Sequence, residues 1–325
     1  MALDLPRLET TEKLSTSVIR ILGGNPSKFT LQGSNTYLLG TGPERILLDT
    51  GEGRDSWRDA LSSTLKSESC TVTTALLSHW HHDHIGGVSA LRALHPNTSI
   101  SVHKHNPTYD PGNSQLDTSK ISPITDGQRF RTPSGFEVQA LHTPGHTTDH
   151  MCFVVTASAS DPSEVGAIFT ADNVLGHGTA VFEDLATYLS SLHIMKDAVS
   201  RSSSPVKAFP GHGAAIPDAL AKISEYIEHR RMREQEALNV LKYGTPTPPP
   251  TEEGSEAADV GALEVIKGKE WGSMEMVKVI YRHYPENLWE PAEKGLLMVL
   301  AKLEAEGRVE RGPQGGWIVL EKAAL

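Results

Sequence analysis

The segment 78–87 constrains this chain more than any other, because it reads Ser-His-Trp-His-His-Asp-His-Ile-Gly-Gly directly after an apolar, strand-like run. Alternate side chains of an extended segment point the same way, so His79 and His81 can present their imidazoles to one ion. If the chain turns into a helix at Asp83, the side chains of Asp83 and His84 reach an adjacent position. Imidazole and carboxylate donors together suit zinc or another borderline divalent metal.

Three further motifs supply the donors that such a string needs from elsewhere. His146 ends the motif Thr-Pro-Gly-His, Asp172 stands in Ala-Asp-Asn, and His212 lies in Pro-Gly-His-Gly. Each motif follows a predicted strand, and α/β proteins gather their sites at the carboxyl ends of strands. We therefore expect all three side chains to meet the segment 78–87.

These donors are enough for two metal ions. The expected ligands are His79, His81 and His146 for one ion, Asp83, His84 and His212 for the other, and Asp172 as the bridge between them. Two cations that share a water lower its pKa and provide hydroxide at neutral pH, and Asp83 is placed to orient that nucleophile as well as to bind metal. Zinc is the expected metal, although His/Asp sets also accept Mn²⁺ and Fe²⁺.

Strand-like and helical segments alternate through residues 1–243, which predicts an α/β protein with sheets inside and helices outside. The expected strands are 18–22, 35–39, 45–49, 73–77, 100–102, 136–141, 151–155, 167–170 and 207–209. The expected helices are 56–65, 88–94, 184–200 and 217–241. The polar, Pro- and Gly-containing segment 106–124 is expected to be a loop.

Residues 244–259 form a Pro-rich spacer between this region and a smaller one. In residues 260–325, two helical segments (274–283 and 291–306) precede a hairpin-like pair of short strands, an order typical of a winged helix. Acidic and basic residues nearly balance there, so the module lacks the basic face of a nucleic-acid reader. We expect it to pack as a wall beside the active site or to form a dimer surface.

Composition excludes several classes of protein. No run of 18 apolar residues exists, which argues against a membrane-spanning helix. The N-terminal segment lacks the apolar stretch of a secretory signal, so we expect a cytoplasmic protein. Forty acidic against thirty basic residues give a net charge of −10, a poor match to a nucleic acid. Two cysteines, Cys70 and Cys152, cannot build a disulfide framework and are expected to be buried.

The segment 79–84 followed by His146, Asp172 and His212 resembles the metallo-β-lactamase superfamily, in order and in rough spacing. Leu48-Asp-Thr-Gly51 and the segment 143–151 are similar to the β-lactamase-like protein 2 group. The segment 171–189 is similar to fungal lactamase-like thioesterases that work beside non-reducing polyketide synthases. The resemblance implies an αββα metallo-β-lactamase sandwich with a dinuclear site at one edge of its two sheets, and a small winged-helix-like C-terminal module.

Four more residues are candidates for the surroundings of the site. Asp49 ends a predicted strand, where it either bonds a metal-binding histidine as an outer partner or caps the following turn. His177 lies five residues after Asp172 and either donates a proton or hydrogen bond to the substrate or is a surface-loop residue. Asn35 and Tyr37 are candidates for the opposite rim of the cleft, in contact with substrate.

The resemblance favours a dinuclear metal-dependent thioesterase that releases a polyketide from an acyl carrier protein domain of its synthase. A second interpretation is a metal-dependent endoribonuclease acting on single-stranded RNA, since some animal relatives of the group have that activity; the net charge argues against it. The third is a non-catalytic synthase partner with structural metal. A structural zinc site closes with four protein ligands and no water, so the larger donor set disfavours this interpretation.

Overall fold

The computed structural model describes residues 5–94, 96, 99–113, 116–202, 204–247 and 268–320. The chain forms two compact units, Met1–Tyr226 and Ile227–Leu325. The sequence-based boundary at residue 243 coincides with the last residue of helix α5 (Ala219–Tyr243). The predicted spacer 244–259 lies outside the described residues from 248 onward, so the limits 1–243, 244–259 and 260–325 stay a proposal.

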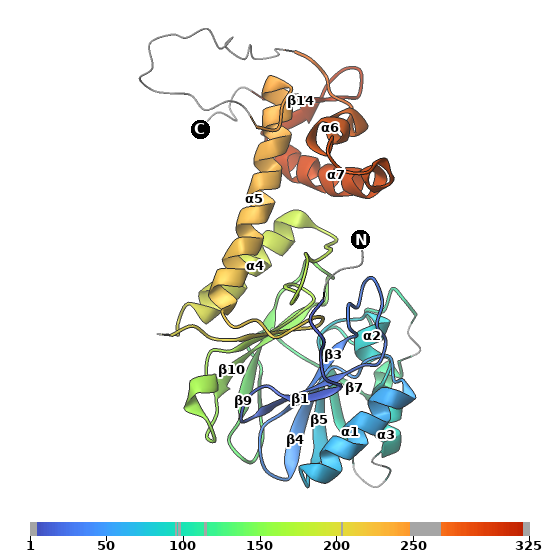
Figure 1. Cartoon of the computed structure of the whole chain (residues 1–325), viewed down its shortest axis with the longest axis vertical. Coiled ribbons are helices and arrows are strands. Elements are labelled where there is room, and N and C mark those ends of the chain that lie inside the picture. Colours follow the sequence, from blue (N-terminus) through green and yellow to red (C-terminus); the bar gives the residue numbers. More distant parts are fainter. Residues whose placement is uncertain are drawn as a thin grey trace. The chain divides into compact units, whose positions relative to one another are not determined.

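The first unit contains two β-sheets (Figure 1). The seven-stranded sheet keeps the order of the chain: β1 (Thr11–Lys13), β2 (Val18–Leu22), β3 (Asn35–Leu39), β4 (Glu44–Leu48), β5 (Thr71–Leu77), β6 (Ser101–Lys104) and β7 (Ile121–Pro123). Strands β1 to β4 pair antiparallel, and β4 to β7 pair parallel. Since neighbouring parallel strands end at the same edge, β4, β5 and β6 deliver their following loops to one side of the sheet.

The five-stranded sheet has the order β12-β11-β10-β9-β8. Its strands are β8 (Arg129–Arg131), β9 (Glu137–His142), β10 (Met151–Ala157), β11 (Ile168–Ala171) and β12 (Ala208–Pro210). Only β11 and β12 run parallel. The expected strands therefore form, but β1, β7 and β8 were not expected. The prediction of a loop throughout 106–124 was wrong for β7 and for the 3-10 turn Thr118–Lys120 before it.

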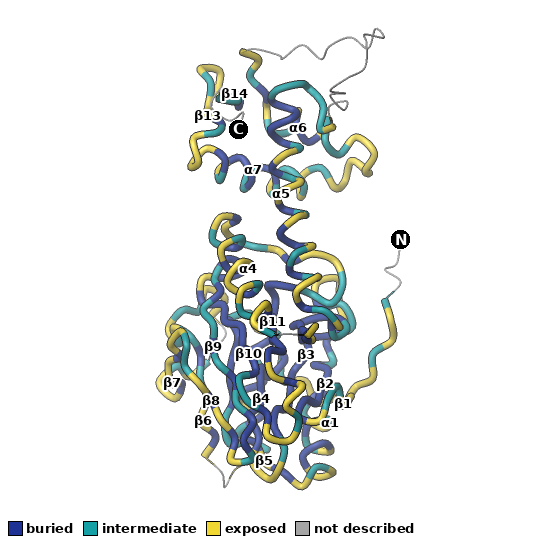
Figure 2. Tube along the Cα trace, turned by 90° about the vertical axis from the view of Figure 1, so that its left-hand side faces the viewer, coloured by how far each residue is buried: buried dark blue, intermediate teal, exposed yellow. Residues whose placement is uncertain are grey.

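Alternation along the strands gives the seven-stranded sheet two apolar faces. Leu48 and Leu76 belong to the cluster between the sheets, where they join Phe153 of β10. Leu47, next to Leu48 on β4, belongs to the opposite cluster with the buried Trp57 of helix α1 (Asp55–Ser67). In Figure 2, dark blue marks the buried residues that result along the strands of both sheets.

Helices cover the outer faces of the sheets. Helix α1 (Asp55–Ser67) and helix α3 (Val88–Leu94) pack on the seven-stranded sheet, and helix α4 (Leu185–Val199) contacts β10 of the other. The layers run helix, sheet, sheet, helix, which confirms the predicted αββα sandwich. Among the described residues, no helix combines the length and apolar character needed to span a bilayer.

The second unit has the expected order of a winged helix. Helix α6 (Ser273–Ile280), the 3-10 turn Glu286–Leu288 and helix α7 (Trp289–Ala305) precede the hairpin of β13 (Val309–Arg311) and β14 (Trp317–Val319). Trp271 adds an isolated bridge to Trp317. The helical limits differ from prediction by a few residues, because helix ends are set by local hydrogen bonds more than by hydrophobic spacing.

Candidate metal centre

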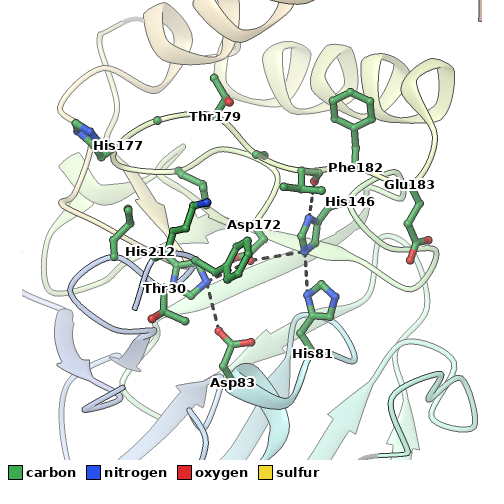
Figure 3. Close-up of a pocket in the computed structure, with 17 residues that line it drawn as sticks. Thr30, His81, Asp83, His146, Asp172, His177, Thr179, Phe182, Glu183 and His212 are labelled. Atoms are coloured by element: carbon green, nitrogen blue, oxygen red, sulfur yellow. Dashed lines mark hydrogen bonds and ion pairs between the residues drawn. The ribbon is translucent and has the colours of Figure 1, made fainter. Parts of the chain in front are cut away.

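All seven predicted donors come together at one edge of the two sheets. Figure 3 shows the five of them that line the pocket above, which are His81, Asp83, His146, Asp172 and His212. The segment after β5 carries His79 and His81 and then enters the short helix α2 (His82–Ile85), which carries Asp83 and His84. From the second sheet, the loops after β9, β11 and β12 bring in the remaining donors, which are His146, Asp172 and His212. Strand ends thus position every donor.

The donors fall into two sets that could each hold a metal ion. The first set is His79, His81, His146 and Asp172, and the second is Asp83, His84 and His212; within each set the donor atoms lie within 4.8 Å of one another. In the first, Nδ1 of His81 lies 2.9 Å from Nε2 of His79 and 3.1 Å from Nε2 of His146. The six other donors divide as expected from the sequence, and Asp172, expected as the bridge, falls in the first set. Metal binding by these residues and the number of ions stay a prediction.

Hydrogen bonds made by Nδ1 of His79 and by Nδ1 of His146 place a proton on that nitrogen of each ring. The hydroxyl of Ser78 donates to Asp49, so it accepts from Nδ1–H of His79 at 2.9 Å. Nδ1–H of His146 donates to the carbonyl oxygen of Val181 at 2.7 Å. Both rings therefore present Nε2 to His81. Such outer partners, which fix tautomer and orientation, typically accompany metal-binding histidines.

The second set places one imidazole between carboxylates. Nε2 of His84 lies 3.3 Å from Oδ2 of Asp83 and 3.4 Å from Oδ1 of Asp172, while its Nδ1–H donates to Asp49 at 2.7 Å. Nε2 of His212 lies 3.2 Å from Oδ2 of Asp172. Asp172 also approaches His146 of the first set, at 3.6 Å. Its carboxylate thus lies within ion-pair distance of histidines of both sets.

The electrostatics of the two sets differ. Burial, followed by repulsion from the neighbouring His146, lowers the pKa of His81 to about 4, so this ring is neutral at pH 7. Burial alone would lower the pKa of His84 as well, but the carboxylates of Asp83 and Asp172 raise it well above its usual value. The second set therefore gathers negative charge that a cation would neutralise.

The arrangement fits metal ions. The imidazole nitrogens gathered within about 3 Å of one another, and the carboxylates gathered around His84, are donor atoms that a divalent cation between them would bind. Nε2 of His84 and Oδ1 of Asp172 are buried and have no hydrogen-bond partner among the described residues. A buried polar atom without a partner is strongly disfavoured, and metal coordination would satisfy both atoms.

Of the residues expected to surround the donors, Asp49 lies as expected, whereas Asn35 and Tyr37 do not. Asp49 accepts hydrogen bonds from the backbone and hydroxyl of Ser78 and from His84, as an outer partner would. Asn35 and Tyr37, expected at the rim, are instead buried, because both side chains donate to the carbonyl of Pro210. They hold the loop that carries His212 and do not line the pocket.

Sequence reasoning did not single out two other residues near the donors. Ser78 connects Asp49 to His79, and the hydroxyl of Ser34 donates to Asp83 at 2.7 Å. Ser78 could have been identified from its position beside His79. Ser34 could not, because it comes from a distant part of the chain.

A pocket of about 510 Å³ opens over the cluster (Figure 3). Its floor carries the donors His81, Asp83, His146, Asp172 and His212, and its walls come from residues 28–31, 175 and 177–183, which include His177. Phe29 and Val181 lie at these walls with 76% and 68% of their surface exposed. Exposed apolar side chains next to a polar floor are typical of a ligand-binding site.

Known proteins share both parts of this architecture. The metallo-beta-lactamase superfamily matches residues 29–158, and the beta-lactamase associated winged helix domain matches residues 272–317. An "Atrochrysone carboxyl ACP thioesterase" of Aspergillus terreus is 38% identical over 97% of this chain and 89% of its own length. The "Beta-lactamase-like protein 2 homolog" of Drosophila melanogaster is 40% identical over 91% of each chain.

A solved structure agrees with the fold. The crystal structure of a metallo-beta-lactamase family protein from Thermus thermophilus superposes with a TM-score of 0.61 at 20% sequence identity, over 95% of this chain and 100% of that one. At this identity the likeness concerns the fold alone.

Proposed function

Because the chain belongs to the metallo-beta-lactamase superfamily of hydrolases, in the group that contains the β-lactamase-like protein 2 homologue and fungal ACP thioesterases, we propose that it is a dinuclear metal-dependent thioesterase. Its proposed substrate is a polyketide chain linked as a thioester to the acyl carrier protein of a non-reducing polyketide synthase in secondary metabolism. The proposed place of action is the cytoplasm, where such a synthase would present its carrier domain. The proposed metal is Zn²⁺.

One observation carries the proposal: two donor sets joined by Asp172 lie at the floor of a pocket whose walls are partly apolar. Metal ions held there would supply Lewis acidity, lowering the pKa of water and polarising a carbonyl oxygen. The apolar side chains Phe29 and Val181 would hold the acyl chain above that floor. A thioester carbonyl would thus be directed to the donors, with its chain on the walls.

The protein's own groups then orient the reactants. Asp83, which accepts a hydrogen bond from the hydroxyl of Ser34, is proposed to accept another from the attacking water and so to direct its oxygen towards the carbonyl. His177 is proposed to donate a hydrogen bond to the substrate from the pocket wall. Water adds to the carbonyl carbon, the carbon–sulfur bond breaks, and acid and thiol leave. A thiolate is a good leaving group, so no strong acid is required.

Two measurements test this proposal. Elemental analysis of purified protein should find two equivalents of zinc per chain. Hydrolysis of an acyl-pantetheine thioester, followed by release of free thiol, should stop with a chelator and return with Zn²⁺.

Single-stranded RNA serves as the competing substrate in the same assay. Cleavage of RNA without thioester turnover would establish the endoribonuclease interpretation instead. Metal-loaded protein that is inert towards both substrates would favour the non-catalytic synthase partner.

A further inference from the structure

A buried ion pair lies beside the metal centre without belonging to it. Nζ of Lys104 is 2.5 Å from Oδ2 of Asp149, and the two side chains are 1% and 0% exposed. Lys104 is the last residue of β6 and pairs in register with Leu77, just before the histidine segment. Asp149 lies in the second sheet's loop between His146 and β10. The ion pair therefore joins the two sheets at the edge where the donors meet.

The ammonium group of Lys104 also fixes the loop that follows β6. It donates to the carbonyl oxygens of His105, Asn106 and Tyr109 at 3.0–3.2 Å. Further along this loop, Gly112 packs so tightly on Trp80 that a Cβ there would lie 2.4 Å from the indole ring.

Trp80 in turn packs against the donor His81. Its ring lies against that of His81, with 4.4 Å between centroids. The loop held by Lys104 thus bounds the space in which the His81 ring can move, and so restricts the orientation of one member of the first donor set.

Asp149 acts on the same set from the other sheet. Its Oδ1 accepts from the hydroxyl of Thr147 at 2.8 Å, which stiffens the turn between His146 and β10. The next residue, His150, accepts at Nε2 from the backbone N–H of Asp172 at 3.2 Å. The turn that Asp149 stabilises therefore begins at the donor His146, and its residue His150 bonds the backbone of the donor Asp172.

We propose that Lys104 and Asp149 are positioning residues that set the geometry of the first donor set, His79, His81, His146 and Asp172. The inference rests on the proposed metal centre. A buried ion pair by itself is weak evidence for stability, because apolar residues of similar volume often replace one without loss. Apolar residues would not supply the directional contacts that this pair makes to two loops.

The decisive variant is the double replacement Lys104→Met with Asp149→Leu, which leaves no buried charge unpaired. Lys104→Met alone strands a buried carboxylate and is expected to unfold far more readily. A second test is Asp149→Asn, which keeps the shape of the side chain and removes its charge. The Lys104 ammonium then retains its three carbonyl acceptors but no counter-charge, so this variant is expected to unfold at a lower urea concentration than wild type. The matched control is Lys120→Met, which breaks the exposed ion pair with Asp117.

The probe is Co²⁺ or Zn²⁺ alone, added to metal-free full-length protein against a competing chelator, with the visible Co²⁺ spectrum as a readout of coordination. We expect the double variant to unfold at a urea concentration near that of wild type, yet to bind the metal at least tenfold more weakly, with an altered spectrum. Asp149→Asn should shift affinity in the same direction, and Lys120→Met should change neither. For thioester hydrolysis, kcat should fall while KM stays.

Wild-type affinity and spectrum in both the double variant and Asp149→Asn would overturn the inference and leave the proposed metal centre intact. If the wild-type protein itself bound no Co²⁺ or Zn²⁺, the proposed metal centre would fail first and the inference with it. The two failures are therefore distinguishable.

Discussion

Replacing Asp49 by asparagine should weaken metal binding while leaving the surrounding backbone in place. The carboxylate of Asp49 accepts three hydrogen bonds, two from Ser78 at 2.8 Å and one from His84 at 2.7 Å. An asparagine amide has one oxygen that accepts and one nitrogen that only donates. The residue has a φ of 59°, a left-handed conformation that asparagine adopts more readily than most residues. Backbone strain is therefore not part of the expected effect.

The size of the loss in metal affinity depends on which hydrogen bond to Asp49 is lost, the one from Ser78 or the one from His84. If the amide nitrogen replaces Oδ2, it faces Nδ1–H of His84, and that ring is no longer held. If it replaces Oδ1, it faces the backbone N–H of Ser78 instead. Loss of a hydrogen bond to a charged group costs about 1.5–3 kcal/mol. Loss of an outer partner typically lowers metal affinity about 10–100-fold, which is about 1.4–2.8 kcal/mol.

The assay is a Zn²⁺ titration against a competing chelator, together with urea unfolding of the metal-free protein. The matched control is Asp117→Asn, which alters a carboxylate paired with Lys120 at the surface. Zinc affinity equal to that of wild type in the Asp49→Asn variant would refute the view that this carboxylate orients a ligand. An equal loss of zinc affinity in the control Asp117→Asn would also refute this view.

Four other predictions address a donor, the pocket and one buried thiol. Asp172→Ala should hold fewer than two zinc equivalents by elemental analysis and lose thioester turnover, since it touches both donor sets. His177→Gln should lower kcat roughly 2–10-fold in the thiol-release assay, the size of one hydrogen bond. Phe29→Ala should raise KM a few-fold for long acyl chains and leave short ones unchanged in the same assay. Burial raises the pKa of Cys152 to about 12, so iodoacetamide at pH 8 should leave it unmodified by mass spectrometry.

The donors could be predicted because each lies in a short motif directly after a strand. The strands themselves are recognisable, since runs such as Thr71–Leu77 are apolar and β-branched and bury most of their side chains. A parallel or antiparallel strand need only end at the right edge for the motif after it to reach the site. Small errors in strand limits therefore do not displace His146 or His212 from the predicted cluster.

Short strands and side-chain directions could not be predicted in the same way. Strands β1, β7 and β8 have three residues each, too few for alternation to be distinguished from a loop. Asn35 and Tyr37 lie two apart on β3, so both point to the same face, but the sequence does not reveal which face. The packing of the sheets turns both inward, against the carbonyl of Pro210.

The contacts that orient the donors are the least accessible to sequence reasoning, because nearly all of them cross between elements. Asp49 reaches His84 across 35 positions, and Val181 accepts from His146 across the same separation. Motif spacing therefore predicts which atoms could bind metal, while tautomer and orientation depend on both sheets being closed together. It follows that the geometry of this site is a property of the packed sandwich, and that residues far from the motifs can change it without contacting a metal.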